Sequence, residues 1–237
     1  MIDLYGMTSP NVRKIFIALE ELELPYEFHH VRVLQGDQFN AEFMRLNPNS
    51  KVPVIVDREG PGGAPYTVFE SGAILLYLAD KTGRLLPTDM AAKHMAIQWL
   101  MIQMANVGPM LGQLNHFRMY APPGNEYSLK RYETEALRLY DMLDRRLAES
   151  EYLAGNEYSV ADIATFPWGL YHENHGFDWA ARPHLKRWCD TIGARPAVIR
   201  ALAKVTAIEP ADAKTMEGAT EESLDRFFNR GWMRDKK

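Results

Sequence analysis

The chain has 237 residues, of which 46% are apolar, and this length suffices for one large domain or two small ones. Its net charge is −4, with 27 basic against 31 acidic residues and no basic stripe, so nucleic-acid binding is not expected. The longest apolar runs, such as Ala73–Ala79, are too short to span a bilayer, and no secretory-type segment opens the chain. The single cysteine, Cys189, excludes an internal disulfide framework. These features predict a soluble cytoplasmic protein.

The first 82 residues alternate predicted strands and helices. Short β-rich segments define the strands, and apolar residues at helical spacing define the helices. Strands are predicted at 2–5, 28–33, 52–56 and 66–69, and helices at 12–22, 39–46 and 71–82. The order β-α-β-α-β-β-α is that of a thioredoxin-like domain over residues 1–82, although other α+β folds share it.

Residues 83–88 read as a linker, and no convincing strand follows it. Helices are predicted at 89–106, 128–149, 160–172, 183–193 and 196–206. The stretch 209–222 looks loosely ordered, while Phe227, Phe228 and Trp232 predict that the last helix docks onto the body or onto a partner. The sequence therefore predicts an all-helical bundle domain over residues 89–237 that ends in a C-terminal tail.

The most specific local pattern is Ser159 followed by Asp162, just before an apolar run. In a capping box the serine hydroxyl accepts a backbone N–H, while the acidic side chain reaches back to the cap residue. Such a box stabilises a helix start by about 1 kcal/mol. We predict a structural role for this pair.

Pro53 opens an apolar strand in the segment Lys51–Pro53. Proline cannot donate to a sheet ladder, so it needs a special position there. A cis Val52–Pro53 bond would turn the backbone N–H and C=O of Val52 outward, where an extended peptide could pair with them. An ordinary edge proline is the alternative.

Glu70 and Ser71 stand where a predicted strand ends and a helix begins. The amides near Ser71 and Gly72 would suit a ligand carboxylate, and Glu70 could accept from an ammonium group. The alternative makes Ser71 a plain helix cap and Glu70 an acid that complements the helix dipole.

The turn Thr8-Ser9-Pro10-Asn11 places a hydroxyl and an amide at another helix start. A thiol held there would be acidified by the helix dipole and by donated hydrogen bonds. Helix capping alone explains the same residues.

Taken together, the Ser9–Asn11 turn, Lys51–Pro53, the Glu70–Ser71 junction and the Ser159–Asp162 box resemble the glutathione S-transferase family, over the chain up to about residue 205. The stretch Gly108–Gln113 is similar to the bacterial nu-class branch of that family, which includes disulfide-bond oxidoreductases. The resemblance implies a cytoplasmic homodimer that uses glutathione as a co-substrate and needs no metal.

The resemblance also implies roles for particular residues. Ser9, standing where that branch has a threonine, and Asn11 would hold the glutathione sulfur. The residues expected to contact the rest of the tripeptide are Gln38, Lys51, Val52, Pro53, Glu70, Ser71 and Arg131. In this set Val52 would pair with the cysteinyl main chain, and Glu70 and Ser71 would hold the γ-glutamyl end. Gln38 and Arg131 would contact the tripeptide backbone or its carboxylates.

The predicted first domain contains no cysteine, so glutathione must supply the active thiol. The leading hypothesis is glutathione-dependent reduction of small disulfides through thiolate attack. Conjugation or thiolytic cleavage of an electrophilic or ether substrate is the second enzymatic option. A non-catalytic glutathione-binding regulator is the third.

Tyr5, Cys189 and the histidines are also chemically reactive, but their sequence context favours a structural role. Tyr5 competes as a thiol activator, but its alternating strand favours a packed tyrosine. Cys189 beside Trp188 reads as helix packing. The histidines show no metal spacing, since His29 and His30 are neighbours on a strand and face opposite sides.

Overall fold

The computed structural model describes residues 1–230, and the chain divides into two compact units. Met1–Ile74 and the chain from Arg200 onward make the first unit, and Leu75–Ile199 makes the second. The sequence predicts a boundary at residue 82 and assigns everything after residue 89 to the helical domain. The observed boundary lies at Ile74–Leu75, before the predicted one. The division also differs at the C-terminal end, because Arg200 and Lys204 form ion pairs with Glu20 at 2.9 and 2.6 Å.

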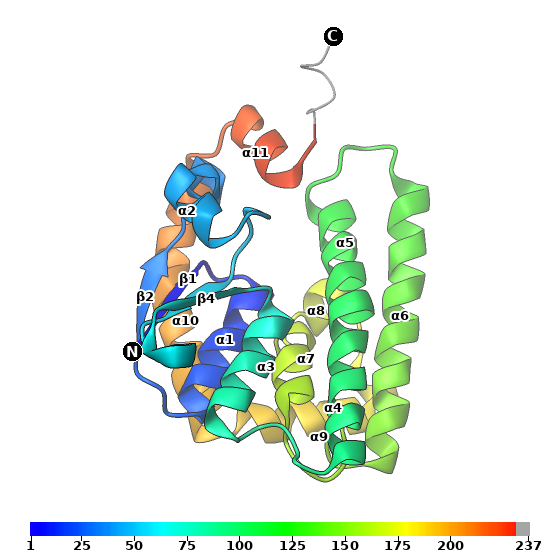
Figure 1. Cartoon of the computed structure of the whole chain (residues 1–237). Coiled ribbons are helices and arrows are strands. Elements are labelled where there is room, and N and C mark those ends of the chain that lie inside the picture. Colours follow the sequence, from blue (N-terminus) through cyan, green and yellow to red (C-terminus); the bar gives the residue numbers. More distant parts are fainter. Residues whose placement is uncertain (231–237) are drawn as a thin grey trace. The chain divides into compact units, whose positions relative to one another are not determined.

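The first unit is built on a four-stranded sheet with the strand order β2-β1-β3-β4. β1 (Ile2–Gly6) pairs in parallel with β2 (Tyr26–His30) and antiparallel with β3 (Val54–Asp57). β3 pairs antiparallel with β4 (Tyr66–Phe69). Helix α1 (Pro10–Glu21) supplies the crossover that two parallel strands require (Figure 1). The predicted thioredoxin-like arrangement is confirmed.

Two predicted strands have shifted bounds. β2 starts at Tyr26 because this residue lies opposite Ile2, the first residue of β1, and it ends at His30 opposite Gly6. β3 starts at Val54, since Pro53 has no N–H to donate to the ladder. The short elements between the strands are η1 (Val33–Gln35), η2 (Asp37–Phe39), α2 (Ala41–Leu46) and η3 (Pro61–Gly63), and α3 (Ser71–Thr82) follows β4.

The C-terminal part of the chain is helical where the sequence predicts loose order. Helix α10 (Pro196–Glu217) continues through Pro210, and α11 (Glu221–Phe228) follows after a short turn, so the prediction for residues 209–222 is wrong. Contacts with distant parts of the first unit hold the helix near Pro210: Arg13 donates to Glu209, and Thr8 donates to Asp212.

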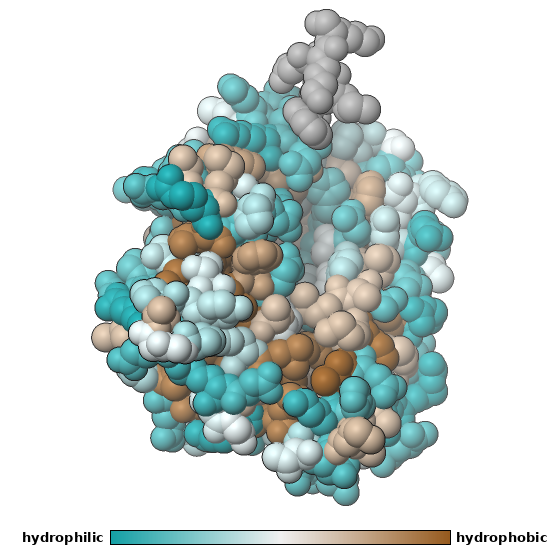
Figure 2. Space-filling view, in the orientation of Figure 1, coloured by the Kyte–Doolittle hydropathy of each residue, from teal (hydrophilic) through white to brown (hydrophobic). Residues whose placement is uncertain are grey.

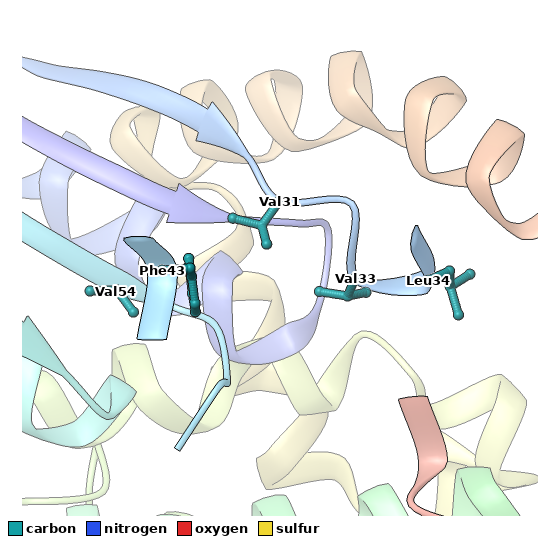
Figure 3. Packing of buried hydrophobic residues seen from close by; sticks show 5 residues of the cluster. All are labelled: Val31, Val33, Leu34, Phe43 and Val54. Carbon is teal, nitrogen blue, oxygen red and sulfur yellow. The ribbon is translucent and has the colours of Figure 1, made fainter. Parts of the chain in front are cut away.

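A cluster of buried apolar residues lies next to the end of the sheet. Its members come from the residue after β2 and from η1, α2 and β3 (Figure 3): Val31, Val33, Leu34, Phe43 and Val54. Leu224 and Phe227 of α11 pack against this cluster, together with Tyr5 and Val52. The predicted docking of the last helix is confirmed for Phe227, whereas Trp232 lies outside the described residues.

The second unit is helical, as predicted. Its helices are α4 (Met90–Ile102), α5 (Gly108–Met119), α6 (Glu126–Glu149), α7 (Val160–Gly169), α8 (His172–His175) and α9 (Pro183–Gly193), with the 3-10 turn η5 (Trp179–Ala181). A π-helical turn, η4 (Gln103–Val107), joins α4 to α5. α5 is not among the helices predicted from the sequence, and its Pro109 lies in the first turn, where proline is tolerated.

The Ser159–Asp162 capping box is present at the start of α7. Asp162 Oδ2 accepts from the backbone N–H of Ser159 at 3.0 Å. Its Oδ1 accepts from Leu153 N–H and from Trp188 Nε1, each at 2.9 Å. Burial raises the pKa of Asp162, while these donors act to lower it. The pair therefore has the structural role that its spacing predicts, and it also ties α7 to α9.

Among the described residues, no helix combines the length and the apolar character needed to cross a membrane. The face drawn in Figure 2 is largely hydrophilic, with hydrophobic residues gathered in smaller groups. Large apolar side chains that reach the surface include Tyr66 and Phe69 on β4 and Met90, Met95 and Met101 on α4.

Candidate functional site

Ser9 is the N-cap of α1, with Pro10 in the first helical position and Asn11 next to it. Ser9 Oγ accepts from Val12 N–H at 3.4 Å, and a hydroxyl that accepts still has its own hydrogen to donate. Asn11 is half-buried in the same turn. The structure thus brings a hydroxyl and an amide to one helix N-terminus, where the helix dipole favours an anion.

A distant aspartate anchors this turn. Thr8 donates to Asp212 Oδ2 from its backbone N–H at 2.7 Å and from its Oγ1 at 2.6 Å. His30 Nε2 contacts the other carboxylate oxygen at 2.7 Å. Asp212 belongs to α10, 204 residues after Thr8, so no local pattern could have predicted the contact.

The Val52–Pro53 peptide bond is cis, which is the first of the two alternatives given for this proline. Val52 is half-buried, and Lys51 is exposed. Asn47 Nδ2 donates to the carbonyl of Lys51 at 2.8 Å and so fixes the main chain just before Val52.

Glu70 has a backbone φ of 68°, in the left-handed region that residues other than glycine rarely adopt. Such strain tends to gather at functional sites. The carbonyl of Glu70 accepts from Ile74 N–H at 2.9 Å, so the amide of Gly72 lies ahead of the first intrahelical bond of α3. Ser71, the first residue of α3, is buried, and the carboxylate of Glu70 is exposed.

Lys14 is a residue of this site that the sequence analysis did not identify. Its side chain is 0% exposed, and its Nζ donates to Ser71 Oγ at 3.1 Å. Burial lowers the pKa of Lys14 to about 7, although the nearby carboxylate of Glu70 acts to raise it. Lys14 therefore links the helix that carries Ser9 and Asn11 to the helix that begins at Ser71.

The two remaining predicted contacts lie in different units. Gln38 is buried in η2, where its Nε2 donates to the carbonyl of Val33 at 3.0 Å and its Oε1 has no hydrogen-bond partner. Arg131 is exposed on α6 of the second unit and lines a pocket of about 490 Å³ with Met110 and Tyr127. Contacts of Gln38 and Arg131 with a ligand stay predictions.

Tyr5 and Cys189, the two side chains that could compete with the glutathione thiol, are both packed against neighbouring residues. Tyr5 stacks on His29 with ring centroids 4.7 Å apart, and burial raises the pKa of its hydroxyl. Burial also raises the pKa of Cys189 to about 12, and its sulfur lies against Gly169. Both findings favour the packed interpretation of these residues.

The carboxylates of Asp3 and Glu27 lie with His29 in a group whose potential ligand atoms are all within 4.8 Å of one another. Arg58 donates to Asp3 at 2.5 and 2.8 Å and to Glu27 at 2.9 Å. These carboxylates are therefore already compensated by a guanidinium group, and the guanidinium lowers the pKa of Asp3.

Comparisons with known proteins identify the family of the chain. The model of the glutathione S-transferase N-terminal domain matches residues 8–81, and that of the C-terminal domain matches residues 94–196. The chain is 46% identical over 205 residues to the disulfide-bond oxidoreductase YfcG of Escherichia coli (strain K12), covering 86% of this chain and 95% of that protein.

Two similar solved structures contain ligands. A glutathione transferase family member from Pseudomonas fluorescens Pf-5, with two glutathione bound, has a TM-score of 0.80 and 45% identity and covers 85% of this chain and 92% of its own. A glutathione transferase from Pseudomonas putida, with one glutathione disulfide bound per subunit, has a TM-score of 0.80 and 40% identity. The match covers 85% of this chain and 90% of the chain in that structure. The chain described here therefore belongs to the glutathione S-transferase family and is an enzyme of that type.

Proposed function

We propose that this protein is a glutathione-dependent thiol–disulfide oxidoreductase that reduces small disulfides. The observation that carries the proposal is the Ser9 hydroxyl and the Asn11 amide at the start of α1, in a unit without cysteine. The relative named as a disulfide-bond oxidoreductase and the neighbours with bound glutathione or glutathione disulfide support it.

Glutathione itself supplies the reacting sulfur. Its thiol loses a proton, and the thiolate is stabilised by hydrogen bonds from Ser9 and Asn11. The thiolate attacks one sulfur of the disulfide substrate, which forms a mixed disulfide and releases a product thiolate that takes up a proton. A second glutathione thiolate then attacks the glutathione sulfur of the mixed disulfide. Glutathione disulfide and a second product thiol result, so two glutathione molecules are oxidised and one disulfide is reduced.

The rest of the tripeptide is held by the neighbouring loops. Val52 pairs with the cysteinyl main chain within the segment that includes Lys51 and Pro53. Glu70 accepts from the γ-glutamyl ammonium group, and Ser71 with the first amides of α3 binds its carboxylate. Gln38 and Arg131 provide further contacts.

Turnover of hydroxyethyl disulfide tests this function, with glutathione regenerated by a coupled reductase. We expect robust activity in the wild type and a large loss in Asn11→Ala. A wild-type rate no greater than that of buffer and glutathione would rule the proposal out. Conjugation of an electrophile and cleavage of an ether substrate would then be measured on the same preparation, and binding without any turnover would identify a regulator.

A homodimer in the cytoplasm is the expected state of this enzyme. The resemblance to the glutathione S-transferase family supports this state, and the elution volume in size-exclusion chromatography would test it.

A further inference from the structure

Asp212 of α10 accepts from both donors of one residue in the turn before α1. Thr8 directs its backbone N–H and its Oγ1 at the same carboxylate oxygen, Oδ2, at 2.7 and 2.6 Å. Thr8 directly precedes Ser9, the N-cap of α1, whose hydroxyl is a donor to the thiolate in the proposed function. Short hydrogen bonds to a carboxylate are stronger than those between neutral groups, so Asp212 fixes both the main chain and the side chain of Thr8.

The other carboxylate oxygen of Asp212 is tied to the sheet. His30 Nε2 contacts Oδ1 at 2.7 Å, and this nitrogen carries the hydrogen because a carboxylate only accepts. His30 is the last residue of β2 and lies opposite Gly6, the last residue of β1. The side chain of Asp212 is only 12% exposed. One nearly buried carboxylate therefore joins the end of the sheet to the turn that follows β1.

Helix α10 is attached to α1 at other places as well. Arg13 donates to Glu209 at 3.1 Å, in the helical turn before Asp212. Lys204 donates to Glu20 at 2.6 Å near the opposite end of α1. These contacts hold α10 against α1 independently of Asp212, whose side chain acts on the turn and on the end of the sheet.

The charge of Asp212 does not explain its place beside this turn. A like charge close to a thiol disfavours the thiolate and raises the thiol pKa. A carboxylate offers instead two acceptor oxygens in one rigid fork. Here one oxygen takes both donors of Thr8 and the other takes His30, so the fork fixes the turn relative to the sheet.

We propose that Asp212, oriented by His30, is a positioning residue that holds the turn at Thr8 and Ser9 in the geometry needed to stabilise the glutathione thiolate. This inference rests on the proposed function. Displacement of a reacting group by about 1 Å costs up to about 100-fold in rate. Loss of the fork should therefore impair turnover more than glutathione binding, because other loops hold the rest of the tripeptide.

Two substitutions at position 212 separate geometry from charge. Asp212→Asn keeps an oxygen for Thr8, and its amide can donate to His30 Nε2 when the imidazole hydrogen lies on Nδ1. Asp212→Ala removes both acceptors. The readouts are the pKa of the bound glutathione thiol, followed by thiolate absorbance, and kcat and KM for reduction of hydroxyethyl disulfide.

We expect the alanine variant to lose thiolate stabilisation. In Asp212→Ala the thiol pKa should rise toward the value of about 8.5 for a free cysteine. Its kcat should fall by up to about 100-fold, with a much smaller change in the KM for glutathione. Asp212→Asn should stay close to wild type in all of these quantities. Thr8→Val removes one of the two bonds to Oδ2 and should give an intermediate loss.

Glu209→Ala is the matched control, because it removes the contact of α10 with Arg13 and leaves the contact with Thr8 intact. It should keep the wild-type thiol pKa and kcat. An equal loss in Glu209→Ala and Asp212→Ala would overturn the inference, since loosening of α10 would then explain both.

Three further results would also overturn it: wild-type values in Asp212→Ala, wild-type values in Thr8→Val, or equal impairment of Asp212→Asn and Asp212→Ala. Thr8→Val decides the matter even if Asp212→Ala does not fold, because it leaves α10 unchanged. A wild type that binds glutathione without lowering the thiol pKa would instead refute the proposed function.

Discussion

Ser9 Oγ accepts from Val12 N–H, and the hydroxyl still has its one hydrogen to donate to a thiolate. Hydrogen bonds to charged groups contribute about 1.5–3 kcal/mol, which corresponds to roughly 10- to 100-fold in rate. We therefore expect Ser9→Ala to lower kcat/KM for disulfide reduction by about that factor. Ser9→Thr keeps the hydroxyl and should retain activity. Steady-state kinetics on hydroxyethyl disulfide check both, and full activity in Ser9→Ala would contradict the role given to Ser9.

Lys14 also makes the stability of the fold depend on pH. Its pKa is about 7 in the folded protein, against about 10.4 for an unfolded lysine. Between these values the unfolded chain binds more protons, so stability rises with pH, and the full cost of the buried charge is present below pH 7. Lys14→Met removes the cost and should be more stable by about 1–4 kcal/mol at its largest.

Urea denaturation across this pH range measures the effect. The advantage of Lys14→Met should be greatest below neutral pH and shrink as the pH approaches about 10. A less stable variant, or a difference that does not change with pH, would show that Lys14 is not buried as a charge.

At the scale of elements, Asp162 joins α7 to α9 through hydrogen bonds from Ser159, Leu153 and Trp188. Asp162→Ala leaves these buried donors without an acceptor, at about 1–3 kcal/mol each. We expect a loss of about 3 kcal/mol or more in the free energy of unfolding, and a smaller loss in Asp162→Asn. Denaturant titration measures both, and a change below about 1 kcal/mol for the alanine variant would contradict the assigned role.

Helix α10 contacts the turn before α1 through Asp212, which accepts twice from Thr8. Freeing Thr8 should let Ser9 move, and small displacements of a reacting group cost up to about 100-fold in rate. We expect Asp212→Ala to lower kcat more than it changes the KM for glutathione. Asp225→Ala is the matched control, because Asp225 of α11 pairs with Arg230 and leaves the turn intact. Equal kinetics for the two variants would refute this link.

Local sequence patterns correctly predicted those elements whose start or end depends on a few neighbouring residues. The Ser159–Asp162 box and the bounds of β4 and α3 were predicted correctly, since capping and strand alternation depend on near neighbours. Lys14 was missed because a lysine in an apolar stripe looks like an exposed charge until Ser71 is placed beside it.

In the whole molecule, long-range contacts determine which unit the C-terminal residues join, and local sequence patterns do not predict this. The residues after Arg200 join the first unit because α10 pairs with α1 and with the turn before it, across 180 to 204 positions of sequence. Proline inside a helix removes a backbone donor, and these distant partners help to hold α10 past Pro210. Fold class could therefore be predicted from the sequence, whereas the contribution of the C-terminal helices to the site could not.

We propose that glutathione is the working thiol and that the start of α1 stabilises its thiolate. The most direct measurement is the ultraviolet absorbance of the thiolate as a function of pH, with glutathione bound to wild type and to Asn11→Ala. In wild type the thiol pKa should lie well below the value of about 8.5 for a free cysteine, and it should return toward that value in the variant. An unshifted pKa in wild type, or the same shift in Asn11→Ala, would contradict the role of this turn.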